Sequence, residues 1–429
     1  MKKSDIQGFL KKESEIDRES HVIFEYIFET LLDPLEAAAH LCQETSTAQW
    51  KRPGVEEDFR PQYAAKVISL DVLDKSSISA FYTNAEGVSS YLRVKVRIAH
   101  PYHNFGTAIP NLLTVAMGEG AFFSHGITAI KLIDIEFPSA YLADFQGPAF
   151  GVGGLRKILN VHDRPMFFGV VKPNVGLDPE SFTKLAYESW LGGLDVAKDD
   201  EMLADPDYSP FKRRVELVGR ARKKAEEKTG EPKAFIANIT GEVDDLLRLH
   251  DIAVENDVNM VMVNVLAIGL SAVRMLRKNA SVPIVAHFDC IAPMTMHPWF
   301  GVGSKVMTKL QRLAGCDAII MPGFGERMKT PDDEVLDNVS ECTKPLSNIL
   351  SSLPVPGGSD WAGSLPSMYE KIKNIDFAMV PGRGVFGHPA GPRAGAMSLR
   401  QAWEAIKGGI SLEDHSIDHP ELLAALKTF

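Results

Sequence analysis

The chain has 429 residues, of which 45% are hydrophobic and 24% are charged, and its formal net charge is −10. This composition is typical of a soluble globular protein, and the length indicates two domains or one large barrel with an appendage. The acidic balance argues against a nucleic-acid partner, because such a protein needs a basic face to displace counterions. No apolar run approaches the roughly 20 residues that span a bilayer, so no membrane association is expected.

The amino-terminal sequence and the cysteines predict the cellular compartment. The opening Met1-Lys2-Lys3-Ser4-Asp5 leads into polar sequence and not into the apolar core of a signal peptide. The four cysteines are widely spaced and form no CxxC pair, so they are interpreted as free thiols of a reducing environment. A cytoplasmic protein is expected.

The first 140 residues predict a small α+β domain. A helix is expected over Leu35–Cys42, where helix formers follow an amphipathic spacing. Strand-like apolar patterns occur at His21–Phe28, Lys66–Leu73, Tyr91–Ala99 and Ile127–Phe137. Strands mixed with few helices, without a strict alternation, favour an α+β arrangement for residues 1–140.

From Met166 the pattern becomes regular and predicts a (β/α)8 barrel over residues 141–429. Apolar runs of strand length recur at Met166–Val171, Leu194–Ala197, Ala234–Ile239, Val258–Val265, Val282–Ala286, Ala318–Met321, Leu353–Val355 and Phe377–Val380. Helical periodicity lies between most of them, at Glu180–Trp190, Phe211–Lys228, Glu242–Glu255, Ser304–Ala314 and Asp332–Leu350, and the chain closes with helices at Arg400–Lys407 and Pro420–Lys427. Eight strand-helix units over about 260 residues are the size of a TIM barrel.

The stretch from Gly192 to Glu201 holds the strongest chemical signal. A short apolar strand opened by glycines ends in Lys198, Asp199, Asp200 and Glu201, and a charged cluster at the carboxyl end of a barrel strand is where such folds place their chemistry. Adjacent carboxylates suit Mg²⁺, and Lys198 would join them if it were neutral and added CO₂ as a carbamate. The alternative is a solvated charge run that starts a helix.

Other polar residues follow the predicted strands and would converge on the same barrel mouth. Lys172 comes after strand one and His287 after strand five. The loops after strands seven and eight commonly bind phosphate through backbone N–H groups. A phosphate site is therefore expected at Gly357, Gly358, Gly382, Arg383 and Gly384, although each glycine group alone is equally explained as a turn.

Taken together, these motifs resemble the large subunit of ribulose bisphosphate carboxylase. The likeness covers nearly the whole chain and rests on Gly169–Pro173 through Leu177, Gly192–Asp195, Lys198–Glu201, Gly357-Gly358, Gly387–Pro389, and Glu44, Ser46, Thr47 and Trp50. It implies an α+β domain, of ferredoxin-like type, followed by the barrel. It also implies a homodimer in which Glu44, Gln49 and Trp50 complete the partner subunit's site, and one Mg²⁺ per subunit held by carbamylated Lys198, Asp200 and Glu201.

Departures from the carboxylase pattern argue against CO₂ fixation. The second lysine of the strand-one loop is Asn174, the asparagine beside the metal-bound substrate is Glu119, and the arginine after the strand-five histidine is Phe288. The strand-six histidine falls at Met321 or Pro322, and the serine before the double glycine is Pro356. Phe288 removes a ligand for a second phosphate. The mobile-loop lysine has no aligned counterpart.

What is retained suffices for enolisation, because a metal that polarises a carbonyl and a nearby base can remove an α-proton. The chain therefore resembles the RuBisCO-like (type IV) proteins, and over Gln43–Arg52 and Met321–Gly325 it is most similar to their branch from photosynthetic bacteria. That resemblance implies an enolase or isomerase acting on a small phosphorylated, possibly methylthio, ketose, as in methionine salvage. It also implies a link to sulfur metabolism and oxidative stress.

Three residues have open roles. Lys172 is expected to act as acid or base, or to bind an anion. His287 contacts a substrate hydroxyl or phosphate, or is a core histidine. Glu119 is a new base, or replaces the lost amide. Two other functions remain: a binding or regulatory protein that kept the fold without turnover, and a true carboxylase.

Overall fold

The computed structural model describes residues 6–49, 56–81 and 90–429. They form two compact units, one of residues 1–145 with 291–307 and one of residues 146–290 with 308–429. The first unit contains β1 (His21–Thr30), α2 (Pro34–Glu44), α3 (Arg60–Tyr63), β2 (Lys66–Ser76), β3 (Tyr91–Pro101), α4 (Ile109–Met117), α5 (Glu119–Phe122), β4 (Ile127–Glu136), α6 (Ser139–Leu142), α13 (Ile291–Thr295) and β10 (Gly301–Val302), with the 3-10 helices η1 (Glu13–Glu15) and η2 (Tyr102–Asn104).

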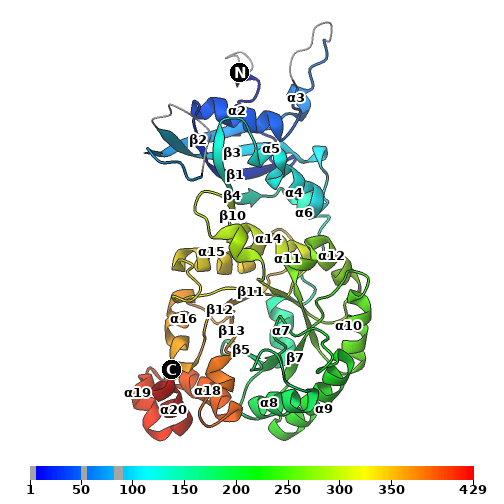
Figure 1. The fold of residues 1–429 in the computed structure, drawn as a ribbon, viewed down its shortest axis with the longest axis vertical. Coiled ribbons are helices and arrows are strands. Elements are labelled where there is room, and N and C mark those ends of the chain that lie inside the picture. The colour runs from blue at the N-terminus through cyan, green and yellow to red at the C-terminus, as the bar shows by residue number, and fades with distance from the viewer. Residues whose placement is uncertain (1–5, 50–55, 82–89) are drawn as a thin grey trace. The chain divides into compact units, whose positions relative to one another are not determined.

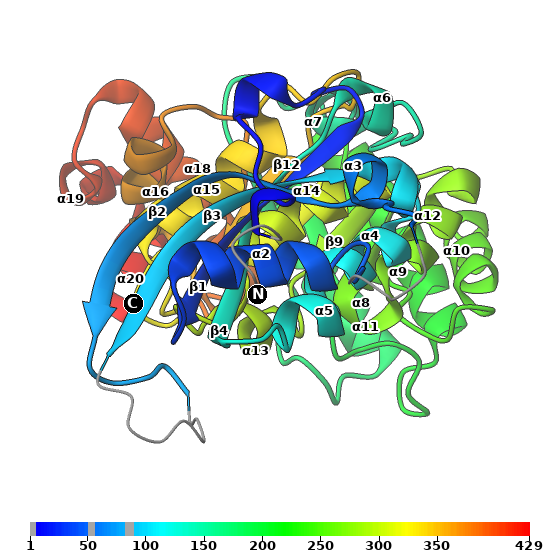
Figure 2. The ribbon, with the colours of Figure 1, turned by 90° about the horizontal axis from the view of Figure 1, so that it is seen from above.

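The strands of the first unit form a sheet of order β10-β4-β1-β3-β2 among the described residues. The central strand β1 pairs antiparallel with β3 and β4, and buries Phe24, Tyr26 and Phe28. Helix α2 begins at Pro34 because the Asp33 carboxylate accepts hydrogen bonds from the next backbone N–H groups. Figures 1 and 2 show α2 lying along one face of this sheet.

The second unit contains the parallel strands β5 (Met166–Val170), β6 (Val196–Lys198), β7 (Ala234–Asn238), β8 (Met260–Asn264), β9 (Ile284–His287), β11 (Ala318–Pro322), β12 (Leu353–Gly357) and β13 (Ala378–Met379). Its helices are α7 (Gly151–Leu159), α8 (Pro179–Leu191), α9 (Phe211–Thr229), α10 (Leu246–Glu255), α11 (Val265–Ile268), α12 (Leu270–Asn279), α15 (Asp332–Thr343), α16 (Leu365–Ile372), α17 (Arg383–Phe386), α18 (Pro392–Gly408), α19 (Leu412–His415) and α20 (Pro420–Thr428), with η3 (Ala362–Ser364) and η4 (Ser416–Asp418). Helix α14 (Ser304–Ala314) begins in the first unit and continues into the second.

These eight strands form a barrel-like sheet, which confirms the predicted fold class. Their hydrogen-bonded order runs β12-β11-β9-β8-β7-β6-β5-β13, and Figure 1 shows α8, α9 and α10 on the outside of the strands. One buried apolar cluster takes side chains from every strand and from α7: Leu155, Leu159, Val161, Met166, Phe168, Val196, Ala234, Ile236, Met260, Met262, Val285, Ala318, Ile320, Leu353, Val355 and Ala378. The interior is therefore a packed core, as in TIM barrels.

Several boundaries differ from the sequence prediction for local reasons. The helix expected over Asp332–Leu350 ends at Thr343, because the residue before Pro345 is disfavoured in helical conformation. The helix expected from Glu242 begins at Leu246, after a turn. Helices α7, α12 and α16 were not singled out from their sequences.

Among the described residues no helix is both long and apolar enough to cross a membrane. All four cysteines are free thiols.

A buried carboxyl joins the two strands at the ends of the barrel order. The backbone N–H of Val380, just after β13, donates to Oδ2 of Asp360, which follows β12, at 3.0 Å. Burial raises the pKa of Asp360 to about 6, although the N–H groups of Val380 and Gly358 lower it in part. Below about pH 6 the folded state therefore keeps this carboxyl protonated, whereas the unfolded chain ionises it at its ordinary, lower pKa.

This raised pKa predicts a pH-dependent loss of stability. Because the folded pKa lies above the unfolded value, stability falls as the pH rises from the unfolded pKa through about 6. Asp360→Asn keeps an acceptor oxygen and does not ionise. We expect the difference in free energy of unfolding between the variant and the parent to grow by roughly 1 kcal/mol, in favour of the variant, as the pH rises from 5 to 8. Urea unfolding across this range measures it.

The exposed Asp337 of α15 provides the control. Asp337→Asn should leave the pH profile of unfolding unchanged. A constant difference between parent and Asp360→Asn over this range contradicts the assignment.

Candidate active site

Glycines position the strand that carries the acidic cluster. A Cβ on Gly192 would lie 2.0 Å from the carbonyl oxygen of Arg393 in α18, and Gly193 has a φ of +101°. The Arg400 guanidinium of the same helix donates to the Gly193 carbonyl at 2.7 Å. Strand β6 therefore begins in close contact with α18, and its carboxyl end delivers Lys198, followed by the buried Asp199 and Asp200.

Lys198 is buried among oxygen atoms. Its Nζ donates to the Asp199 carbonyl at 2.8 Å and to Oε2 of Glu201 at 3.3 Å. Burial lowers the pKa of the Lys198 ammonium, while the carboxylates of Glu201 and Asp200 raise it in part. A lowered pKa increases the share of neutral amine, which is the form that adds CO₂.

Asp200 is bridged to the loop after β5. Its side chain is fully buried, and its Oδ2 lies 2.9 Å from Nζ of Lys172, a side chain that is 31% exposed. The same ammonium donates to Oδ1 of Asn174 at 2.6 Å. The structure therefore brings the predicted Lys172 to the predicted acidic cluster.

Glu201 links the cluster to the end of β9. His287 Nε2 lies 3.2 Å from Oε2 of Glu201. Burial alone would raise the pKa of Glu201, but Lys198 and His287 lower it to about 2, so this carboxylate is ionised. Nδ1 of His287 lies 3.4 Å from Oδ2 of Asp289, and ligand atoms of Glu201, His287 and Asp289 all lie within 4.8 Å of one another.

Asp289 was missed by sequence reasoning, as were two asparagines. Asn238 Nδ2 and Asn264 Nδ2 donate to the Glu201 carbonyl at 2.9 and 3.3 Å, from the last residues of β7 and β8. The signal was available, because all three residues end or closely follow a barrel strand. The two asparagines hold the backbone of the acidic loop from two neighbouring strands.

Asp199 has a different role from its neighbours. Its two oxygens lie 3.0 and 3.3 Å from the guanidinium of Arg214, and one also accepts the N–H of Asn238 at 3.0 Å. Both side chains of this ion pair are fully buried. With its oxygens occupied in this way, Asp199 serves the structure of the loop.

We expect Asp199→Ala to lower the free energy of unfolding by about 3–5 kcal/mol, because it leaves the Arg214 guanidinium buried without its carboxylate. Urea unfolding measures this loss. Asp200→Ala is the comparison: its partner Lys172 is part-exposed and stays hydrated, so the loss should be clearly smaller. Equal losses would contradict the division of roles.

The predicted phosphate-binding glycines lie in two loops that pack closely. A Cβ on Gly357 would meet Val380 at 2.6 Å, one on Gly384 would meet the Asp360 carbonyl at 2.5 Å, and one on Gly382 would meet Cε of Lys172 at 2.8 Å. Gly358 follows β12 directly. Packing thus accounts for Gly357 and Gly384, and the contact of Gly382 with the flexible end of Lys172 brings the loop after β13 to that lysine.

Arg383 contacts an aromatic ring near the carboxyl terminus. It is exposed, and its guanidinium lies over the ring of the terminal Phe429, 5.6 Å from the ring centre. A phosphate contact for Arg383 and the four glycines stays a prediction.

The predicted residues of the first unit lie on neighbouring elements of that unit. Glu44 ends α2 and the exposed Glu119 begins α5, and these elements touch because a Cβ on Gly120 would lie 2.6 Å from the Glu44 carbonyl. The Gln49 amide donates to the Glu57 carbonyl and accepts from the Phe59 N–H, both at 2.8 Å. Trp50 lies outside the described residues.

The barrel residues fit a Mg²⁺ ion. Buried Asp200 and part-exposed Glu201 offer carboxylate oxygens, the ligands that this cation prefers, and Lys198 has the lowered pKa that a carbamate requires. A buried acceptor, Oδ1 of Asn264, has no hydrogen-bond partner within the described chain. Such an oxygen is costly unless a ligand or water satisfies it.

Fold and site together define a two-domain α/β-barrel protein with a candidate metal centre. Residues 151–429 match the catalytic-domain model of the ribulose bisphosphate carboxylase large chain, and residues 9–141 match its N-terminal-domain model. The chain belongs to the ribulose bisphosphate carboxylase large-chain family.

The similar proteins in this family carry names that describe different activities. The chain is 56% identical to a ribulose bisphosphate carboxylase-like protein of Allochromatium vinosum, over 100% of this chain and 94% of that one. It is 33% identical to a 3-oxo-isoapionate-4-phosphate decarboxylase of Rhizobium rhizogenes, over 88% and 90%. The octameric ribulose-1,5-bisphosphate carboxylase/oxygenase of Pyrococcus horikoshii has a TM-score of 0.89 at 29% identity, over 99% and 96% of the two chains. The predicted resemblance to RuBisCO-like proteins is confirmed.

Proposed function

We propose that the protein is a RuBisCO-like enzyme that enolises or isomerises a small phosphorylated ketose and does not fix CO₂. The observation that carries this proposal is the cluster of Lys172, Lys198, Asp200, Glu201 and His287 around the end of β6. Lys198 as a carbamate, Asp200 and Glu201 would hold Mg²⁺. When bound, the cation would polarise the substrate carbonyl and make the neighbouring C–H bond more acidic.

The chain's own residues would then move the proton. Lys172 is the side chain that we propose transfers the proton. It contacts the carboxylate of Asp200, and its side chain is 31% exposed to solvent. His287 Nδ1 has no hydrogen-bond partner within the described chain, although Asp289 Oδ2 lies 3.4 Å away, and this nitrogen is the proposed contact for a substrate hydroxyl or phosphate oxygen. Gly357, Gly358, Gly382, Gly384 and Arg383 are the proposed phosphate-binding group.

Departures from the carboxylase pattern support a reaction other than CO₂ fixation. Phe288 stacks on the His287 ring with 4.8 Å between centres, where carboxylases are expected to have an arginine for a second phosphate. A substrate with one phosphate is consistent with this apolar neighbour. The proposed link to sulfur metabolism, methionine salvage and oxidative stress rests on the resemblance alone.

Exchange of an α-proton tests the proposed enzyme directly. With Mg²⁺ and bicarbonate, we expect the parent to exchange the α-proton of a ketose phosphate with deuterated water, measured by NMR on a panel of ribulose phosphates and methylthio-substituted ketose phosphates. Lys198→Ala, Asp200→Ala and Glu201→Ala should each lower the rate by about a hundredfold or more, since each removes part of the metal site.

Glu227→Ala, on the exposed face of α9, is the matched control and should exchange at the parental rate. Parent protein without exchange on any substrate of the panel would favour a binding or regulatory protein instead. Incorporation of labelled CO₂ into ribulose bisphosphate would favour a carboxylase.

The decarboxylase relative gives a second candidate reaction. Loss of CO₂ from a 3-oxo acid phosphate breaks a C–C bond and leaves its electron pair on the carbon beside the carbonyl, so the same polarising site and a proton donor such as Lys172 would serve. Release of CO₂ from 3-oxo-isoapionate 4-phosphate, without proton exchange on the ketose panel, would favour this reaction.

We also propose a homodimer whose subunits share each site, with Glu44, Gln49 and Trp50 contributed by the partner. We expect Glu44→Ala and Lys198→Ala to be inactive separately. When mixed in equal amounts and allowed to exchange subunits, they should recover about a quarter of the parental exchange rate, because about half of the dimers are then mixed and half of the sites in mixed dimers are intact. Each variant incubated alone is the control, and no recovery contradicts a shared site.

A further inference from the structure

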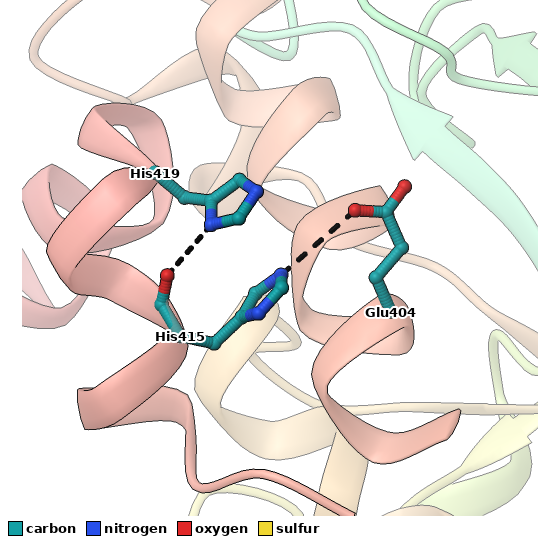
Figure 3. Close-up of side chains that lie close together, drawn as sticks. All are labelled: Glu404, His415 and His419. Carbon is teal, nitrogen blue, oxygen red and sulfur yellow. Dashed lines mark hydrogen bonds and ion pairs between the residues drawn. The ribbon is translucent and has the colours of Figure 1, made fainter. Parts of the chain in front are cut away.

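Three side chains near the carboxyl terminus form a second cluster, apart from the candidate active site. Glu404 belongs to α18, His415 ends α19, and His419 follows η4. One ligand atom from each lies within 4.8 Å of the other two. Figure 3 shows both imidazole rings with a nitrogen turned toward the Glu404 carboxylate.

His415 carries an unsatisfied nitrogen toward this cluster. Its Nε2 is buried and has no hydrogen-bond partner within the described chain. The nearest oxygen in the cluster, Oε2 of Glu404, is 3.8 Å away, which is beyond hydrogen-bond distance. A buried polar atom without a partner is costly, so its direction toward two other potential ligands calls for an explanation.

His419 is oriented by the backbone. Its Nδ1 lies 2.6 Å from the carbonyl oxygen of His415, and because a carbonyl only accepts, this nitrogen carries the proton. In the neutral ring the lone pair is then on Nε2. A histidine whose second nitrogen donates to a carbonyl is the usual arrangement of a metal ligand. The two rings stack, with 3.9 Å between their centres.

We propose that Glu404, His415 and His419 bind a zinc ion that fastens the C-terminal segment to α18. Two imidazole nitrogens and one carboxylate oxygen are a ligand set typical of Zn²⁺ with water in a fourth position, whereas Mg²⁺ prefers oxygen ligands. Zn–N and Zn–O distances near 2.1 Å place ligand atoms about 3.4 Å apart, so the cluster contracts slightly on binding. The Glu404 side chain is 61% exposed and is free to make that adjustment.

The site joins elements that are close in sequence but are separated by a turn. Residues 409–411 connect α18 to α19, and the bound ion would cross-link the two sides of this turn. An ion that binds only the folded segment stabilises it. The expected consequence is a C-terminal segment that opens less often when zinc is present.

Zinc binding to the full-length protein tests the site, measured by isothermal titration calorimetry with zinc chloride. We expect His415→Ala and His419→Ala each to weaken binding at least tenfold. Glu404→Gln should also weaken it, and its exposed side chain makes this variant safe for the fold. His162→Ala, an exposed histidine of the same unit, should bind as the parent does.

A further variant separates this site from the histidine and carboxylates of the candidate active site. His287→Ala should retain the zinc binding that His415→Ala loses. Hydrogen exchange supplies an independent measurement: zinc should slow amide exchange of residues 409–429 in the parent and not in His415→Ala. Equal zinc affinity of parent and the His415→Ala/His419→Ala double variant would overturn the proposal, as would exchange of residues 409–429 that zinc does not alter.

Discussion

The candidate site depends on the buried ion pair between Asp199 and Arg214. The pair fixes the first residue after β6, since Asp199 also accepts the Asn238 N–H from the neighbouring strand. A carboxylate and a guanidinium with no exposed surface are costly to separate, so the loop has one stable conformation. That conformation directs Asp200 and Glu201 toward Lys172, Lys198 and His287.

Residues 195–201 contain acids with structural roles and acids of the candidate site. The cationic side chain that pairs with each acid distinguishes the two roles. Asp195, before β6, is bound by both Nη atoms of Arg164 at 2.7 Å and contacts Arg400. Its pairing with arginines is structural, like that of Asp199. Asp200 and Glu201 are paired with lysines and a histidine, whose charge depends on their surroundings.

Much of this arrangement was predictable because the barrel imposes its own geometry. Apolar runs placed the strands within a few residues, and residues at their carboxyl ends, Lys172, Lys198, Asp200, Glu201 and His287, did meet. The side chains that hold the loop from behind, Asn238, Asn264 and Arg214, were not predicted. An asparagine at a strand end or an arginine in a helix has many common uses, and only the three-dimensional fold assigns one.

The glycines and the residues of the first unit were harder to interpret for a different reason. The glycines at 357 and 384 carried a phosphate prediction, yet close packing against Val380 and the Asp360 carbonyl also favours small residues there. A glycine in the sequence indicates that a side chain does not fit at that position. It does not show whether the neighbour is packed protein or a bound ligand. Glu119 and Glu44 adjoin each other in the first unit, which neither residue's local sequence indicated.

The contact between β6 and α18 bears on the order in which the protein forms. Arg400 reaches the Gly193 carbonyl across 207 positions of the chain, and Gly192 has no room for a side chain against Arg393. Contacts of such long sequence separation form late, because a large loop must close first. During synthesis the acidic strand therefore lacks its support until the last barrel helix has left the ribosome, and a truncated chain would present these buried charges in an unfinished barrel.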